Sequence, residues 1–110
     1  MDKTPLHKLC YDSSVTSSKI NAYVNDNGVD AALAVDAIYG MIPLHILSMN
    51  PNAPADAISA LLVVNMEAAF RVDYQGKNSL DYAREYNAGG LVGMVNVLCN
   101  HRYAQHEHEN

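Results

Sequence analysis

Basic residues are scarce in this sequence. Seven lysines and arginines stand against twelve aspartates and glutamates, so the formal net charge at pH 7 is −5. A protein that binds nucleic acid without regard to sequence needs several basic side chains on one face to neutralise phosphates, and no basic cluster occurs here. The composition therefore argues against a nucleic-acid partner and mildly favours a basic segment of another protein.

Long apolar runs and cysteines are also few. No run of about 18 apolar residues could span a bilayer, and no hydrophobic signal segment follows Met1, so we expect no membrane association and a cytoplasmic protein. The two cysteines, Cys10 and Cys99, are too few for a disulfide framework. We expect both to be reduced and to pack in helices as small hydrophobic residues.

Phosphate-binding loops are absent as well. Gly89-Gly90 precedes a predicted helix but lacks the lysine and the hydroxyl residue of a Walker loop and the spacing of a Rossmann loop. We interpret this pair as a flexible turn between helices. The sequence predicts no cofactor.

One short phrase is present three times. Residues 4–7 (Thr-Pro-Leu-His), 43–45 (Pro-Leu-His) and 79–81 (Ser-Leu-Asp) align, with Pro5, Pro43 and Ser79 in equivalent positions 38 and 36 residues apart. Residues 29–36 also align with residues 66–73 at an offset of 37. Repeats of this period indicate stacked supersecondary units.

Each copy predicts the start of a helix. Thr4 and Asn78 offer capping oxygens, whereas Ile42 offers none and predicts a weaker start for the middle helix. Gly40 and Gly76 precede two copies, where a tight turn needs positive φ, and the turn at Gly40 is one residue longer. The expected helices cover about residues 5–11, 16–24, 43–49, 55–64, 79–86 and 91–101, followed by a frayed polar tail at 103–110.

These motifs resemble those of ankyrin-repeat proteins. Residues 4–7 reproduce the family's T-P-L-H motif, and residues 73–83 follow its D-x-x-G-x-T-P-L-x-x-A line, with departures at Asn78, Ser79 and Asp81. The period is longer than usual, because extra residues lie in the turns between paired helices, at Asn50–Pro54 and Asn87–Gly90. The usual glycine between paired helices is missing from the first two units. The motif residues are Thr4, Pro5, Leu6, His7, Gly40, Pro43, Leu44, His45, Asp73, Gly76, Leu80 and Ala83.

The resemblance implies an all-α fold, a short ankyrin-like solenoid of about three helix-turn-helix repeats joined by extended turns. The repeat domain would cover residues 1–102, with units at about 1–35, 36–72 and 73–102. It implies a non-catalytic scaffold or adaptor that binds a protein through its turn tips and concave inner-helix face. The expected partner contacts are Tyr39, Met41, Tyr74, Gln75, Lys77, Glu85 and Tyr86, whereas Tyr82 is expected to pack inside.

The histidines invite a catalytic interpretation that the repeat disfavours. His7 and Cys10 lie three residues apart, but no nucleophile signature surrounds Cys10. His7 and His45 occupy equivalent positions, and a catalytic histidine is rarely needed once per unit. The resemblance implies that both form hydrogen bonds between repeats. No catalytic residue is predicted.

Two other functions remain open. The chain could be a terminal or capping piece of a larger repeat protein, with binding done elsewhere. A metal-binding protein could use His101, His106 and His108 with Cys99, although their spacing fits no structural zinc motif and we predict no metal site. A short stack also exposes apolar end faces, so the chain could form a weak homodimer through one of them.

Overall fold

The computed structural model describes residues 5–109, and the side chains of residues 6–28 and 30–100. Within this range every regular element is helical and no strand occurs, which confirms the all-α prediction. Two 3₁₀ helices, η1 and η2, follow the second and fourth of six α-helices. The elements are α1 Pro5–Tyr11, α2 Ser17–Asn27, η1 Val29–Leu33, α3 Pro43–Met49, α4 Ala55–Val64, η2 Met66–Phe70, α5 Ser79–Tyr86 and α6 Ala88–Glu109.

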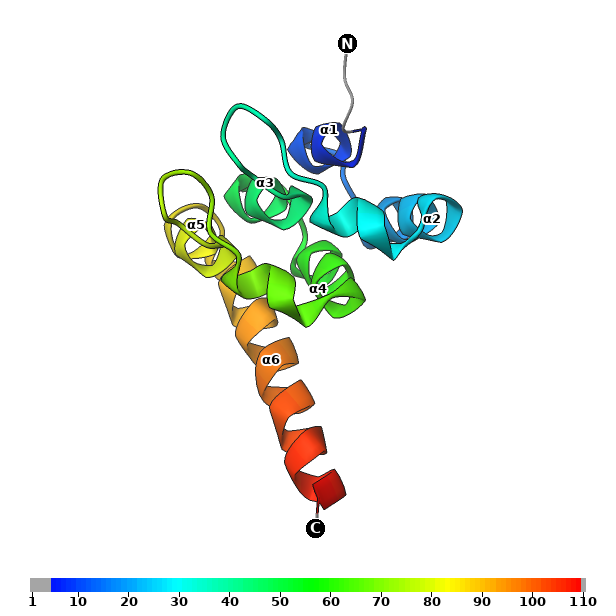
Figure 1. Cartoon of the computed structure of the whole chain (residues 1–110), viewed down its shortest axis with the longest axis vertical. Helices are drawn as coiled ribbons and strands as arrows, with labels where there is room; N and C mark the ends of the chain where they lie inside the picture. Colours follow the sequence, from blue (N-terminus) through cyan, green and yellow to red (C-terminus); the bar gives the residue numbers. More distant parts are fainter. Residues whose placement is uncertain (1–4, 110) are drawn as a thin grey trace.

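The helices form three consecutive pairs that lie side by side (Figure 1). In one row α3 packs between α1 and α5, and in the other α4 packs between α2 and α6. The loops that follow η1 and η2, residues 34–42 and 71–78, project from the row of α1, α3 and α5. We call these two loops the turn tips and the helices of this row the inner helices. We call the contact of the first two pairs the first junction and the contact of the second and third pairs the second junction.

The core is continuous across both junctions. Residues 43–48 of α3 are all buried, because this helix has a neighbour on each side. Apolar side chains of both rows join one cluster, so removal of these side chains from water stabilises the stack as a whole. Its largest fully buried members include Leu6, Ile20, Leu44, Leu47, Ile58, Leu61, Leu62 and Met94.

Four helices begin and end where the sequence predicts, and two differ. The Thr16 hydroxyl accepts a hydrogen bond from the Lys19 amide at 3.2 Å, so α2 begins after this cap, and it continues to Asn27. The Asn87 side chain accepts from the Gly90 amide at 2.9 Å, which starts α6 at Ala88, ahead of the predicted start. The same helix continues to Glu109, so the prediction of a frayed tail is wrong; alanine, glutamine and glutamate there are good helix formers.

The sequence suggested extended connections between the helix pairs, but the connections are extended only in part. Each begins with a 3₁₀ helix and becomes extended only at Ala34 and Arg71. Ala32, Ala68 and Ala69 are buried, because small side chains let these turns lie close to the helices. The repeat between residues 29–36 and 66–73 is thus a repeat of conformation.

Candidate binding surface at the turn tips and inner helices

The two turn tips are organised by equivalent aspartates. The Asp36 carboxylate accepts hydrogen bonds from the amides of Tyr39 and Met41 at 3.2 and 3.0 Å. Its own amide donates to the Met41 carbonyl at 2.9 Å, which closes the turn over five residues. The Asp73 amide donates to the Lys77 carbonyl at 2.9 Å, which closes its turn over four. The predicted wider first tip is confirmed.

The tips also contact each other. The Tyr74 amide donates to the Tyr39 carbonyl at 3.0 Å. Gly40 has φ +71°, and a methyl group on its Cα would overlap the Tyr74 ring. Glycine is therefore required here twice, for the backbone angle and for the close approach of the ring. The two tips form one continuous surface, on which the Tyr74 side chain is still 70% exposed.

The motif histidines connect neighbouring helix pairs. His7 Nε2 donates to the Met41 carbonyl at 2.8 Å, and His45 Nε2 donates to the Arg71 carbonyl at 2.9 Å. Each imidazole therefore joins its helix to the loop that leads into the next pair. The bond of His7 joins the first and second units, as the resemblance implied, whereas the bond of His45 reaches Arg71 near the end of its own unit.

His45 supplies the half of a capping box that needs no side-chain oxygen at Ile42. Its Nδ1 accepts from the Ile42 amide at 3.0 Å, so the proton lies on Nε2. Burial lowers the pKa of His45, although its bond to the Arg71 carbonyl favours the charged form. His7 Nδ1 is buried without a partner among the described residues, and the equivalent donor position, Thr4, lies outside them.

In the third copy Asp81 keeps only the capping half of this role. The Asn78 amide donates to the Asp81 carboxylate at 3.1 Å, and the Asp81 amide donates back to the Asn78 side chain at 2.9 Å. This reciprocal pair is a capping box.

Cys10 is not set up as a nucleophile paired with His7. Cys10 is fully buried, and burial raises the pKa of its thiol to about 12, so a thiolate is negligible at neutral pH. Its neighbour His7 is already bonded to the Met41 carbonyl. Cys99 is exposed, which corrects the expectation that it packs in the core.

Two asparagines that the sequence interpretation treated as turn residues form a ladder through the stack. The Asn50 side-chain amide donates to the carbonyls of Cys10 and Asp12, both at 2.9 Å. The Asn87 side-chain amide donates to the carbonyls of Asn50 and Ala53, again at 2.9 Å. Each asparagine directly follows an inner helix and satisfies carbonyls of the preceding pair. Their offset of 37 residues was the available signal.

Tyr82 closes the second junction. Its ring packs edge-to-face on His45, with centroids 5.9 Å apart and planes at 88°, and its hydroxyl donates to Asp73. The Lys77 ammonium lies 5.6 Å from the ring centroid and 3.6 Å from the Glu85 carboxylate. Tyr82 is only 4% exposed, which confirms it as a packing residue. Burial, reinforced by the bond to Asp73, raises the pKa of its phenol.

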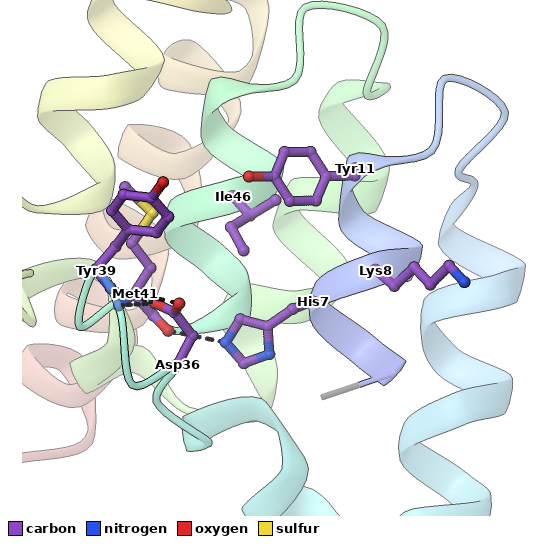
Figure 2. Close-up of a pocket in the computed structure, with 7 residues that line it drawn as sticks. All are labelled: His7, Lys8, Tyr11, Asp36, Tyr39, Met41 and Ile46. Carbon is purple, nitrogen blue, oxygen red and sulfur yellow. Dashed lines mark hydrogen bonds between the residues drawn. The ribbon is translucent and has the colours of Figure 1, made fainter. Parts of the chain in front are cut away.

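The first junction is open at the equivalent place. A pocket of about 320 Å³ lies between α1, α3 and the tip formed by residues 34–42 (Figure 2). Figure 2 shows the Tyr11 and Tyr39 side chains at its two sides, with Ile46 of α3 between them. The seven lining residues are His7, Lys8, Tyr11, Asp36, Tyr39, Met41 and Ile46.

The predicted partner contacts are mostly accessible. Tyr39, Tyr74 and Tyr86 are 54%, 70% and 51% exposed. Gln75 and Glu85 are exposed, and Lys77 is partly covered by its contacts with Tyr82 and Glu85. Met41 differs from the expectation, since it is only 8% exposed and lines the pocket at the first junction.

Tyr11, at 62% exposed, was missed by the sequence interpretation. It is the last residue of α1, as Tyr86 is the last residue of α5, so comparison of helix ends could have found it. On the last helix, Val92 and Val95 are 60% and 44% exposed, at the end of the stack where a weak homodimer could form.

The remaining chemistry of the chain is limited. Among the described residues no three histidine, cysteine or acidic side chains gather as metal ligands. The histidines of the alternative metal-binding hypothesis, His101, His106 and His108, lie outside the described side chains. No helix in residues 5–109 has both the length and the apolar character to cross a bilayer. Comparisons of the chain with protein families, curated proteins and solved structures found no match.

Proposed function

We propose that this chain is a non-catalytic protein-interaction module, built as a short ankyrin-like solenoid, that acts as a cytoplasmic scaffold or adaptor. It binds its partner through the turn tips and the inner helices. One observation carries the proposal. Four tyrosines that the core does not use, each more than half exposed, come from the two tips or from the last residues of α1 and α5: Tyr11, Tyr39, Tyr74 and Tyr86.

Tyrosine suits this role because its ring gives a large contact area with few rotatable bonds, and its hydroxyl tolerates water when no partner is bound. The tips are also preorganised. Asp36 and Asp73 fix their backbones, and the bond from Tyr74 to Tyr39 holds the tips together. A rigid surface loses little conformational entropy on binding, which favours affinity.

The solenoid half of the proposal is supported by bonds that recur at the period of the sequence. Histidines 38 residues apart bond to the next loop, and asparagines 37 residues apart bond to the preceding pair. The non-catalytic half is supported by the state of the candidate nucleophile, because Cys10 is buried. The net charge of −5 favours a basic partner segment.

The test is retention of partners from a lysate of the source cells by a tagged chain. Tyr39→Ser/Tyr74→Ser is the test variant, and Val63→Ser/Phe70→Ser, which changes residues 57% and 60% exposed on α4 and η2, is the matched control. Circular dichroism must show all three chains equally folded. A partner kept by the wild type and the control but lost by the test variant supports the proposal. Equal retention by all three places binding elsewhere, and no retention favours the capping role.

A further inference from the structure

We propose that the pocket at the first junction binds a phenol group, which a tyrosine side chain of the protein partner supplies, with its hydroxyl donating to Asp36. The phenol site follows from the internal repeat of this chain. Its assignment to a partner's tyrosine rests on the function proposed above.

The two junctions place equivalent residues around one position. Asp36 corresponds to Asp73 and His7 to His45, since both pairs hold the same places in the tip and the inner helix. On α3 and α5, Ile46 corresponds to Tyr82, at the same offset of 36 residues as the motif. The second junction thus shows what these surroundings hold when a large side chain is present.

At the second junction that side chain is a phenol. Asp73 uses Oδ1 for the amides of Gln75 and Lys77, at 2.9 and 3.0 Å, and leaves Oδ2 for the Tyr82 hydroxyl. The imidazole of His45 makes a T-shaped contact with the ring of Tyr82. An aspartate, an imidazole and the inner helix therefore form a complete phenol-binding site within the chain.

At the first junction an aspartate also holds the tip through Oδ1, without the phenol. Asp36 uses Oδ1 for the amides of Tyr39 and Met41, at 3.2 and 3.0 Å. Its Oδ2 accepts only longer bonds from Ile38 and Tyr39, at 3.3 and 3.4 Å, and so retains capacity for a strong donor. Ile46 is shorter than tyrosine and has no hydroxyl, and the pocket of about 320 Å³ is lined by Ile46 together with His7 and Asp36, the counterparts of the residues that hold the Tyr82 ring.

The lining selects a phenol over other groups. Tyr11, Met41 and Ile46 offer apolar contact and a sulfur atom suited to an aromatic ring. A phenylalanine side chain would cover the Asp36 carboxylate oxygen without donating a hydrogen bond to it, and burial of an acceptor without a donor costs free energy. The Asp36 charge disfavours a phosphotyrosine.

The direct test uses p-cresol and toluene, which differ only by the hydroxyl, in NMR titrations of the full chain. We expect p-cresol to shift the amide signals of residues 36–42 and to bind about tenfold or more tightly than toluene, as a hydrogen bond to a carboxylate implies. Ile46→Tyr supplies the chain's own phenol and should abolish binding of p-cresol, whereas Ile46→Leu should retain it. Equal binding of both probes, or no binding of p-cresol, overturns the phenol site.

A second variant keeps the test valid if Ile46→Tyr does not fold. Tyr82→Ala should open an equivalent site under Asp73, so p-cresol should raise its melting temperature more than that of the wild type, and more than toluene does. Equal effects of p-cresol on the two chains would overturn the equivalence of the two junctions, on which the inference depends.

The source of the phenol is tested separately. N-acetyl-tyrosinamide should bind and compete with p-cresol, whereas N-acetyl-phenylalaninamide should not; binding of p-cresol alone would overturn the assignment to a side chain. If the chain retains a partner from lysate but does not bind p-cresol, the phenol site is overturned and the proposed function stands. Binding of p-cresol with no partner retained would support the phenol site and overturn the interaction function.

Discussion

The first and second junctions share their polar connections but differ in one large side chain. In each, a histidine of an inner helix donates to a loop carbonyl of the next pair, and an asparagine side chain donates to two carbonyls of the preceding pair. The second is closed by Tyr82, which is 4% exposed. The first has Ile46 at that position and an open pocket beside it.

This difference distinguishes the hydrogen bonds that stabilise both junctions from the side chain that determines whether a junction has room for a ligand. The repeated bonds involve backbone carbonyls, which must be satisfied in every junction when they are buried. The side chain on the inner helix has no such constraint, and it decides whether the space under the tip is filled. Departures from the repeat are therefore the places to look for function in this chain.

Removal of Tyr82 should have the largest effect, because it makes the second junction resemble the first. Tyr82→Ala should lower the free energy of unfolding by about 3–5 kcal/mol, the usual cost of deleting a buried aromatic side chain. Urea denaturation followed by circular dichroism measures this loss. Tyr82→Phe keeps the ring and should cost about 1.5–3 kcal/mol for the bond to Asp73. A loss below about 1 kcal/mol for Tyr82→Ala would mean that the junction does not need closing.

The asparagine ladder should contribute at both junctions. Asn50→Ala leaves the carbonyls of Cys10 and Asp12 without this donor, and we expect a loss of about 1–3 kcal/mol. Asn87→Ala should cost less, because Asn87 is half-buried whereas Asn50 is 8% exposed. Urea denaturation of both variants gives the comparison. A larger loss for Asn87→Ala than for Asn50→Ala would contradict it.

Helix positions could be predicted from the sequence because local signals define them. Proline at the start of α3 and the Asn78 cap of α5 act within one turn of chain, and the predicted bounds of these helices are confirmed. The 3₁₀ helices were missed because their alanines are chosen by packing against distant helices. The start of α6 was missed because Asn87 was assigned to a turn, while it caps this helix.

The candidate surface could be predicted only in part. Tyr39 and Tyr74 were found because turn glycines mark the tips, but the burial of Met41 depends on how α1 and α3 pack. The pocket lies beside Ile46, where the other repeat has the larger Tyr82, and no local sequence pattern marks a position at which a large side chain is replaced by a smaller one. Only alignment of Ile46 with Tyr82, combined with the observed bond to Asp73, reveals it.

The turn glycines should distinguish the two tips. Both Gly40 and Gly76 have positive φ, at +71° and +80°, so alanine at either position should cost about 1–2 kcal/mol in backbone strain. A methyl group at Gly40 would also meet the Tyr74 ring, whereas Gly76 has open space around the equivalent position. Gly40→Ala should therefore destabilise the chain more than Gly76→Ala, as thermal unfolding can show. Equal shifts in melting temperature would mean that Tyr74 yields freely.

The smallest expected effect is a dependence of stability on pH that originates at His45. Burial lowers the pKa of His45 in the folded chain below the ordinary value of about 6.5 for histidine. As the pH falls below about 6.5, the unfolded chain therefore binds a proton at this ring before the folded chain does. The free energy of unfolding should decrease from pH 7.5 to pH 5.5.

Asp73 does not contribute in that range, which makes the test specific. Burial alone would raise the pKa of Asp73, but the hydrogen bonds from Tyr82 and from the amides of Lys77 and Gln75 together lower it, so its contribution is lost only in more acid solution. Urea denaturation at pH 7.5 and 5.5 should show a smaller decrease for His45→Gln than for the wild type. If both chains lose the same stability between these pH values, His45 is not held neutral at the second junction, and its bond to the Arg71 carbonyl survives protonation, since that bond needs only the proton on Nε2.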